Sequence, residues 1–237
     1  MLKYKRVLLK LTGESMVGKG KTGIDFEFVS LLALGIKKLL KATPVQLAIV
    51  NGGGNIFRGR NYKGTEGDPA QIDYIGMLGT VMNALALGHE LEINGVPARV
   101  MSALRVDQVC EPFIRKRAIH HLEKGSVVII GGGTGSPFFT TDSAAALKAA
   151  EINADLLLKA TNVDGVYDHD PKTHKNATRY TKITFSEALT RGLTVMDATA
   201  FDLCRARKIP VVVFDISDFE NVGRIINGEE IGTLITP

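Results

Sequence analysis

The sequence of 237 residues contains no tryptophan, and only 6% of its residues are aromatic. Proteins that stack the bases of single-stranded nucleic acids normally present several aromatic faces, so this composition argues against such a surface. The two cysteines, Cys110 and Cys204, lie far apart and outside any CxxC or Cys/His spacing. Neither a disulfide framework nor a structural zinc site is therefore expected, and a reducing compartment suits the chain.

Long apolar runs are also missing, because no segment reaches the length that spans a bilayer. The first residues, MLKYKRVLLKL, place basic side chains before an apolar run, but Lys10 interrupts that run too early for a signal peptide. The charge is nearly balanced, with 29 basic and 25 acidic residues. Since there is no signal peptide and no membrane-spanning run, we expect a cytoplasmic protein without a membrane partner. Since there is no helix-turn-helix pattern and no concentrated basic face, we expect no nucleic-acid partner.

Short apolar segments alternate with segments of helical character along most of the chain. The strand-like segments are VLLKL, VQLAIV, ARVMSA, SVVII, ADLLLKA and IPVVVFDI. This alternation predicts an α/β fold in which helices cover both faces of a largely parallel sheet. The signals for helix starts are Asp25, Asp68-Pro69, Asp142 and the capping box of Thr184 and Glu187. The turn-rich region near 160–180 is the expected seam between two lobes.

The segment GGGTGSPFFTTDSAA, residues 131–145, follows an apolar strand and precedes a helix, but it lacks the GK[ST] ending of a Walker loop. Two other strands end in glycine loops, KLTGE at 10–14 and GGGNIFR at 52–58. Ligands of parallel sheets bind at the carboxyl ends of the strands, and glycine lets backbone N–H groups approach an anion closely. The three loops together predict a phosphate-binding site at this edge.

Three cations are candidates for this site: Lys10, Arg58 and Lys159. Lys10 lies within an apolar strand, where an unpaired ammonium is costly to bury, although a lysine that extends to the surface would avoid this cost. Arg58 suits bidentate phosphate recognition, and its alternative is a surface arginine. Asp142 is either an ordinary carboxylate of a helix start or the group that orients the lysines. Such a site suits phosphoryl transfer, which depends mainly on positioning and charge neutralisation.

A dinucleotide-binding site is a weaker interpretation of the same glycine loop. Gly131-x-Gly133-x-x-Ser136 nearly matches GxGxxG, and Glu151 follows at about the expected distance. Pro137, however, biases Ser136 away from helical geometry and delays the helix beyond the glycines. A dehydrogenase of this kind is therefore not expected.

Taken together, the motifs resemble those of the amino-acid kinase superfamily, and within it those of the bacterial uridylate (UMP) kinases. The matching blocks are KRVLLKLTGES, NGGGNIFRG, IGMLGTVMNALAL, GTGSPFFTTDSAA, LLKATNVDGVYDHDP, VMDATAF and GTLITP. The resemblance implies a three-layer α/β/α sandwich with a largely parallel central sheet. It also implies a homohexamer that transfers the γ-phosphoryl group of Mg-ATP to UMP in pyrimidine nucleotide biosynthesis. One amino-acid kinase domain would cover residues 1–237, with an acceptor lobe at about 1–158 and an ATP lobe at about 159–237.

The resemblance also assigns roles to residues. The implied catalytic residues are Lys10, Arg58, Asp142 and Lys159. The implied ATP-binding residues are Lys10, Leu11, Thr12, Gly13, Gly54, Arg58, Thr161, Asn162, Tyr167 and Asp170. The implied UMP-binding residues are Gly53, Arg58, Asp73, Thr134, Gly135, Ser136, Pro137, Phe138, Phe139, Thr140 and Thr141. Mg²⁺ would be carried by ATP, without a direct protein ligand.

The family is commonly activated by GTP and inhibited by UTP, and the resemblance places the GTP response in one short segment. This segment comprises Gly18, Lys19, Gly20, Lys21, Thr22 and Gly23. Two departures from the family pattern stand out: Ser136 occupies a position that is usually asparagine, and residues 60–72 match poorly. The alternatives are a family member with another acceptor, such as carbamate or an acylated amino acid, and a non-catalytic regulator that senses nucleotides.

Overall fold

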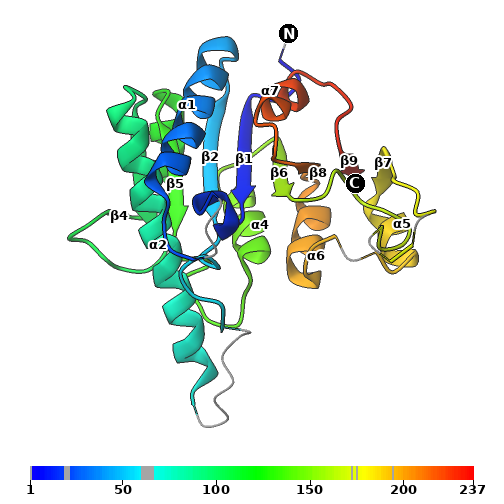
Figure 1. The fold of residues 1–237 in the computed structure, drawn as a ribbon, viewed down its shortest axis with the longest axis horizontal. Helices are drawn as coiled ribbons and strands as arrows, with labels where there is room; N and C mark the ends of the chain where they lie inside the picture. Colours follow the sequence, from blue (N-terminus) through cyan, green and yellow to red (C-terminus); the bar gives the residue numbers. More distant parts are fainter. Residues whose placement is uncertain (1, 19–21, 60–66, 172, 175, 194) are drawn as a thin grey trace.

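A computed structural model describes residues 2–18, 22–59, 67–171, 173–174, 176–193 and 195–237. In these residues the strands form one nine-stranded sheet of order β4-β3-β5-β2-β1-β6-β8-β9-β7 (Figure 1). Neighbouring strands of this sheet are parallel, except for the antiparallel pair of β8 and β9. The strands are β1 (Arg6–Leu11), β2 (Gln46–Asn51), β3 (Ala98–Ser102), β4 (Glu111–Pro112), β5 (Val127–Gly131), β6 (Leu156–Thr161), β7 (Lys182–Thr184), β8 (Val211–Asp215) and β9 (Thr233–Thr236).

Helices cover both faces of the sheet and enclose a separate hydrophobic core on each. The core on one face contains buried side chains of α1, α2 and α7, and the core on the other contains those of α3, α4, α5 and α6. This arrangement confirms the α/β sandwich of three layers. The helices are α1 (Phe26–Ala42), α2 (Pro69–Ile93), α3 (Arg115–Glu123), α4 (Thr141–Glu151), α5 (Phe185–Thr190), α6 (Ala198–Arg207) and α7 (Glu220–Ile226), with a 3₁₀ turn η1 (Gly13–Met16).

The helix starts follow the sequence signals closely. Asp25 accepts hydrogen bonds from the first turn of α1, and Asp68 does the same for α2, whose first residue is Pro69. Thr184 and Glu187 form the expected capping box of α5. The start of α4 differs from the sequence signal, because the N-cap is Thr140 and Asp142 lies in the first turn of the helix. None of the helices in the described residues is long and apolar enough to cross a membrane.

The parallel sheet brings the glycine loops to one edge, where β1, β2, β5, β6 and β8 all end. β1 lies at the centre, between β2 and β6. Its register places Lys10 beside Lys159 of β6, while Leu11 pairs with Asn51 of β2. Two lysines that are far apart in the sequence therefore become neighbours through strand pairing alone.

Candidate active site

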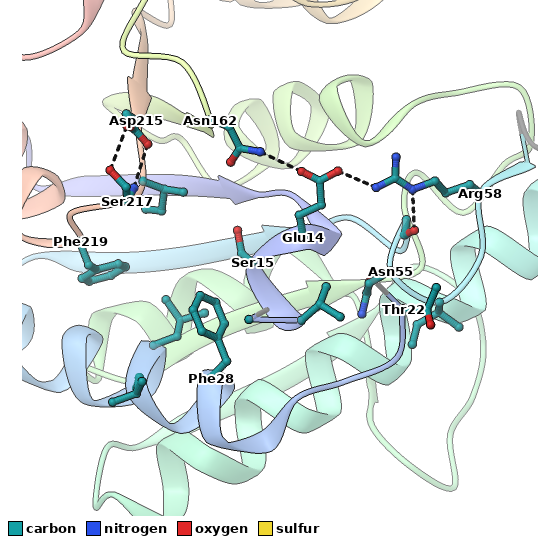
Figure 2. A pocket seen from close by; sticks show the side chains of 17 residues that line it. Glu14, Ser15, Thr22, Phe28, Asn55, Arg58, Asn162, Asp215, Ser217 and Phe219 are labelled. Carbon is teal, nitrogen blue, oxygen red and sulfur yellow. Dashed lines mark hydrogen bonds and ion pairs between the residues drawn. The ribbon is translucent and has the colours of Figure 1, made fainter. Parts of the chain in front are cut away.

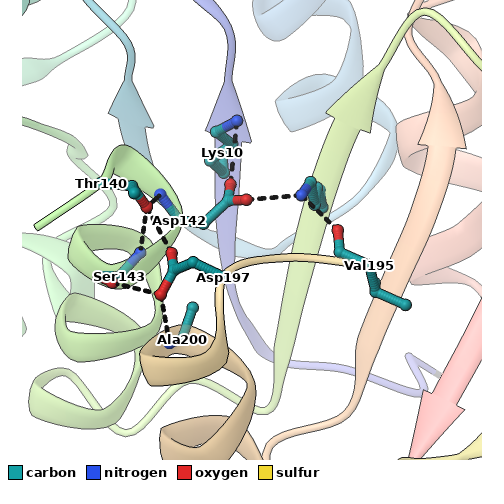
Figure 3. A network of polar contacts seen from close by, with 8 residues as sticks. Lys10, Thr140, Asp142, Ser143, Val195, Asp197 and Ala200 are labelled. Atoms are coloured by element: carbon teal, nitrogen blue, oxygen red, sulfur yellow. Dashed lines mark hydrogen bonds and ion pairs between the residues drawn. The ribbon is translucent and has the colours of Figure 1, made fainter. Parts of the chain in front are cut away.

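Lys10 and Lys159 share one carboxylate, that of Asp142 in the first turn of α4 (Figure 3). Lys10 Nζ lies 3.1 Å from Asp142 Oδ1, and Lys159 Nζ lies 2.6 Å from Asp142 Oδ2. The exposed fractions of the Lys10, Lys159 and Asp142 side chains are only 11%, 13% and 17%. Two adjacent ammonium groups repel each other when they are withdrawn from water, so the carboxylate between them compensates their charge. The interpretation of Asp142 as the group that orients the lysines thus has a geometric basis.

The environment of Lys159 pulls its pKa in opposite directions. Burial lowers the pKa of this lysine, and the neighbouring charge of Lys10 adds to that effect. Asp142 and, less strongly, Asp197 raise the pKa and offset part of the shift, which remains downward. Lys159 Nζ also donates to the carbonyl oxygen of Val195 at 2.5 Å, so the ammonium is held from two sides.

A second carboxylate, Asp197, ties the end of the predicted acceptor loop to α6 (Figure 3). Its side chain accepts from Thr140 Oγ1 at 2.5 Å, from Ser143 Oγ at 2.8 Å and from the backbone N–H of Ala200 at 3.0 Å. Burial raises the pKa of Asp197, but these hydrogen bonds outweigh it, and the net pKa is lowered. Sequence reasoning gave Asp197 no role, although it lies in the family block VMDATAF and caps α6.

Glu14 joins Arg58 to Asn162 across three strand-end loops (Figure 2). Arg58 Nη2 donates to Glu14 Oε1 at 2.6 Å, and Asn162 Nδ2 donates to Glu14 Oε2 at 2.9 Å. Arg58 Nε also donates to the carbonyl oxygen of Gly54 at 2.9 Å, which fixes the guanidinium over the second glycine loop. Glu14 was not among the predicted site residues, and its position directly after Gly13 is the signal that could have identified it.

The first two glycine loops approach each other so closely that a side chain on Gly13 could not be accommodated. A Cβ added at Gly13 would lie 2.5 Å from Asn55 Oδ1 and 2.7 Å from the backbone nitrogen of Gly54. The third loop needs glycine for another reason, because Gly132 and Gly133 have φ values of 77° and 58°. Close packing therefore requires glycine at position 13, and the backbone conformation favours it at positions 132 and 133, whereas the sequence pattern suggests glycines for the approach of N–H groups to an anion.

A cavity of about 690 Å³ gathers many of the predicted UMP-binding residues. Its lining includes Gly53, Arg58, Asp73, Phe139, Thr140 and Thr141. Asp73 Oδ2 accepts from the backbone N–H of Phe138 at 2.7 Å, and Phe138 has a left-handed φ of 71°. A non-glycine residue in this region is strained, so the hydrogen bond that the Phe138 N–H donates to Asp73 stabilises an unfavourable loop conformation.

The remainder of the predicted acceptor loop is held mainly by its own contacts. Thr134 Oγ1 donates to the carbonyl oxygen of Ser136 and accepts from the Ser136 N–H, at 2.9 and 3.2 Å. Gly135 has a φ of 84°. Pro137, which follows Ser136, lies outside any helix or strand. The side chain of Phe138 is 71% exposed, so this part of the loop is open to solvent.

A larger cavity of about 1070 Å³ lies beside the first glycine loop. Its polar wall contains Glu14, Gly54, Arg58 and Asn162 (Figure 2). Gly18 and Thr22 of the predicted GTP segment line it as well, together with apolar side chains of α1. Gly23 has a φ of 88°, while Lys19, Gly20 and Lys21 of that segment lie outside the described residues. The poorly matching stretch 60–72 is likewise described only from residue 67 onward.

The other predicted ATP-binding residues lie near these groups or farther along the chain. Leu11 is buried at the end of β1, and Thr12 is the N-cap of η1. Thr161 Oγ1 donates to the carbonyl oxygen of Val163 at 2.7 Å. The Tyr167 hydroxyl donates to Asp164 at 2.7 Å, and the Asp170 carbonyl oxygen accepts from the N–H of Thr173. Tyr167 and Asp170 line neither of the two cavities in the described part of the chain.

The donor set does not form a metal cage of its own. Among the described residues, no group of three or more His, Cys, Asp or Glu side chains could hold a metal ion. Asp142, the carboxylate at the centre of the site, directs one oxygen to each lysine. What the arrangement offers is positive charge near the carboxyl ends of three strands, on Lys10 of β1, on Lys159 of β6 and on Arg58 after β2, which suits a phosphorylated ligand.

Comparison with known proteins matches residues 5–215 to the amino acid kinase family. The chain is similar to a UMP kinase of Bacillus anthracis, with 38% identity and a TM-score of 0.94 over 98% of this chain and 96% of that one. A UMP kinase of Ureaplasma parvum has 38% identity and a TM-score of 0.91, over 99% and 100% of the two chains. A uridylate kinase of Archaeoglobus fulgidus has 30% identity and a TM-score of 0.70, over 97% and 99%. The similarity therefore extends along nearly the whole chain.

Proposed function

Because this chain belongs to the amino acid kinase family, we propose that it transfers the γ-phosphoryl group of ATP to the phosphate of UMP, giving UDP and ADP. The observation that carries the proposal is the meeting of Lys10 and Lys159 around Asp142. Asp142 directly follows Thr140 and Thr141, which line the cavity of the predicted acceptor residues. The similar chains from Bacillus anthracis and Ureaplasma parvum are both UMP kinases.

The proposed mechanism relies on charge and position rather than on a strong base. The acceptor is a phosphate oxygen, which is already ionised at neutral pH, so no proton has to be removed from it. In the transition state, negative charge is spread over the oxygens of the transferred group. Lys10, Lys159 and Arg58 would stabilise this charge, and Asp142 would hold the two ammonium groups at a fixed separation. Asp142 therefore acts on the lysines and not on the acceptor.

Mg²⁺ would enter with the phosphates of ATP. Bound there, it would neutralise charge on the β- and γ-phosphates. The residues fit this arrangement, because Asp142 directs both of its oxygens to lysines and so does not need to ligate the metal. Lys10 and the backbone N–H groups of Thr12, Gly13 and Gly54 would bind the ATP phosphates on the protein side.

The acceptor lobe would comprise about 1–158 and the ATP lobe about 159–237. Asp73 would accept from the ribose hydroxyls of UMP, with Gly53 and Arg58 at its phosphate and residues 134–141 around the nucleoside. Thr161, Asn162, Tyr167 and Asp170 would contact the adenosine part of ATP, where Tyr167 offers an aromatic face. The bridge of Glu14 between Arg58 and Asn162 would then connect the two substrate sites.

The assembly would be a homohexamer that acts in the cytoplasm in pyrimidine nucleotide biosynthesis, with GTP as activator and UTP as inhibitor. Support for subunit contact comes from α2, on which Ile75, Leu78 and Met82 are 46%, 47% and 50% exposed. Large apolar side chains grouped on one exposed helix are typical of a protein interface.

The proposal is tested by a coupled assay of UDP formation with Mg-ATP and three acceptors, UMP, CMP and dUMP. We expect UMP to be the preferred acceptor by kcat/KM. A parallel assay with carbamate and an acylated amino acid distinguishes this reaction from that of other family members. If only carbamate or the acylated amino acid is phosphorylated, that compound and not UMP is the substrate. Inactivity with all five acceptors would refute the kinase function.

A further inference from the structure

A buried pair of asparagine side chains lies beneath the first two glycine loops. Asn55 directly follows the three glycines of the second loop and is 1% exposed, and Asn83 of α2 is 0% exposed. Asn55 Nδ2 donates to Asn83 Oδ1 at 2.9 Å, and Asn83 Nδ2 donates to Asn55 Oδ1 at 2.7 Å. Each amide thus pairs with the other in both directions. Two amides removed from water are costly unless their hydrogen bonds are made, so this pair depends on its geometry.

The second N–H of each amide reaches the backbone of a different loop. Asn83 Nδ2 donates to the carbonyl oxygen of Gly52 at 2.7 Å. Asn55 Nδ2 donates to the carbonyl oxygen of Gly23 at 2.7 Å, and the Gly23 N–H donates back to the Asn55 carbonyl oxygen at 2.9 Å. The pair therefore connects α2, the loop after β2 and the segment that leads into α1.

The loop after β1 packs directly on the same pair. A Cβ at Gly13 would lie 2.5 Å from Asn55 Oδ1, so Gly13 is in close contact with that amide oxygen. A Cβ at Gly52 would lie 3.1 Å from the Gly13 nitrogen, which shows how closely the two loops are stacked. The separation of the N–H groups on these loops consequently depends on the position of the Asn55 side chain.

We propose that Asn83 and Asn55 are positioning residues for phosphoryl transfer, which hold the loops of Gly13 and Gly52 at the separation that the reacting phosphates require. This inference rests on the proposed function. Asn83 is fully buried and lines neither cavity of the described residues, whereas Asn55 is 1% exposed and is among the residues that line the larger one. Both amides direct their hydrogen bonds to each other and to loop carbonyl groups, so they would act through the loops. An amide is suited to this task because it donates and accepts in one plane, whereas leucine, with the same branched shape, would fill the space without fixing a carbonyl group. A displacement of about 1 Å between reacting groups can cost about 10²-fold in rate.

The test uses Asn83→Leu, Asn55→Leu and the double variant in the full chain. Turnover and both KM values are measured at a temperature where circular dichroism shows every variant folded. The thermal midpoint of each variant is measured in a separate temperature scan. We expect each single variant to lose at least about tenfold in kcat, with changes in KM of less than about threefold, because positioning acts mainly in the transition state. The midpoint of the double variant should fall by less than the sum of the two single shifts, since fewer buried amide groups are left unpaired. Its kcat should nevertheless stay as low as in the single variants.

The matched control is Leu87→Ala, one turn farther along α2 and also fully buried. We expect it to lower the midpoint without a comparable loss of kcat. Recovery of kcat in the double variant would show that the amide pair only stabilises the fold. The same conclusion would follow if Leu87→Ala lost as much kcat as an asparagine variant with the same thermal midpoint. If Asn83→Leu does not fold, Asn83→Ser, which retains a hydroxyl donor, is measured against the same expectations. Inactivity of the unaltered protein would instead refute the proposed function, and this inference with it.

Discussion

Lys159 donates to Asp142 across 2.6 Å, and both side chains are largely withdrawn from water. A second lysine, Lys10, lies on the other oxygen of the same carboxylate. One negative charge therefore offsets only one of two positive charges, and the net positive charge that remains would attract the incoming phosphate of the proposed reaction. The pair is costly to bury, so its value lies in the reaction more than in stability.

Asp142→Asn should lower kcat by about 10²-fold, because the two lysines lose the charge that holds them in place. It should also move the alkaline limb of the pH–rate profile to lower pH. In the proposed mechanism Lys159 acts as an ammonium ion, so activity should be lost as the pH rises through its pKa. That pKa is already lowered by burial, and Asp142 is the main group that raises it. Profiles from pH 6 to 10 test this, with Asp107→Asn, in a surface ion pair with Arg105, as control. An unshifted limb would argue against the role of Lys159.

Lys10→Ala and Arg58→Ala should each reduce kcat by about 10²-fold or more, since in the proposed mechanism both cations stabilise charge that develops in the transition state. The fold and the sedimentation behaviour of the unaltered protein should be retained, as measured by circular dichroism and analytical ultracentrifugation. Lys116→Ala, at an exposed position of α3, is the matched control. Near-normal turnover in either active-site variant would remove that residue from the catalytic set.

Asp73→Asn should raise the KM for UMP by about tenfold while leaving the KM for ATP unchanged. Asparagine can still accept from the Phe138 N–H, but it replaces one carboxylate oxygen by a donor and binds two hydroxyls less well. Asp68→Asn is the control, because asparagine caps helices as well as aspartate does. The kcat/KM for UMP and for dUMP is measured with the unaltered protein and with Asp73→Asn. If Asp73 binds the 2′-hydroxyl, the loss of kcat/KM from the substitution and the loss from removing that hydroxyl will not add. Fully additive losses would place Asp73 away from that group.

Asp197→Asn should destabilise the protein by about 1–2 kcal/mol at pH 7, through weaker hydrogen bonds from Thr140 and Ser143. The pKa of Asp197 is lower in the folded protein than the ordinary 3.8. Its carboxylate therefore stabilises the fold fully above about pH 4, and the contribution is lost as the pH falls through the lower folded pKa. Urea unfolding between pH 7 and pH 3 should show a smaller decline for the variant than for the unaltered protein. Asp202→Asn, in an exposed pair on the same helix, should keep the original pH dependence.

The two thiols should react very differently with a thiol reagent at pH 8. Cys204 is fully buried, and burial, together with Asp142 and Asp197, raises its pKa to about 12. Cys110 is partly exposed, and burial with the nearby carboxylates of Asp107 and Glu111 raises its pKa as well. Only slow labelling of Cys110 is expected in the native protein, whereas both thiols should react in denaturant. Rapid native labelling of Cys204 would contradict the packing of α6.

The sequence was sufficient to predict the central strands, the caps of α1, α2 and α5, and the presence of lysines within two apolar strands. Buried parallel strands are short apolar runs, and Lys10 and Lys159 stand out because each lies in such a run. The strands β4 and β7 were not predicted, since two or three residues carry no periodicity. Helices α6 and α7 were also not predicted, although Asp197 offered a cap signal for α6.

The contacts that complete the site could not be predicted, because they join residues that are distant in the sequence. Thr140 meets Asp197, and Glu14 meets both Arg58 and Asn162, only after strands from both halves of the sheet have paired. A local pattern indicates that a residue is polar and near a strand end. It does not indicate which of several polar residues will face it.

The central place of β1 has a consequence for the newly made chain. On one side β1 pairs with β2, which follows soon after it, but its other neighbour is β6, and residues 12–155 lie between them. During translation the backbone N–H and C=O groups on one edge of this apolar strand therefore lack their partner until most of these 237 residues have been made, and such an edge is a natural site for chaperone binding or aggregation. Lys10 is made early, while Asp142 and Lys159 arrive late. The enzyme cannot acquire activity in stages, because its charged centre forms only when the last neighbour of its first strand is in place.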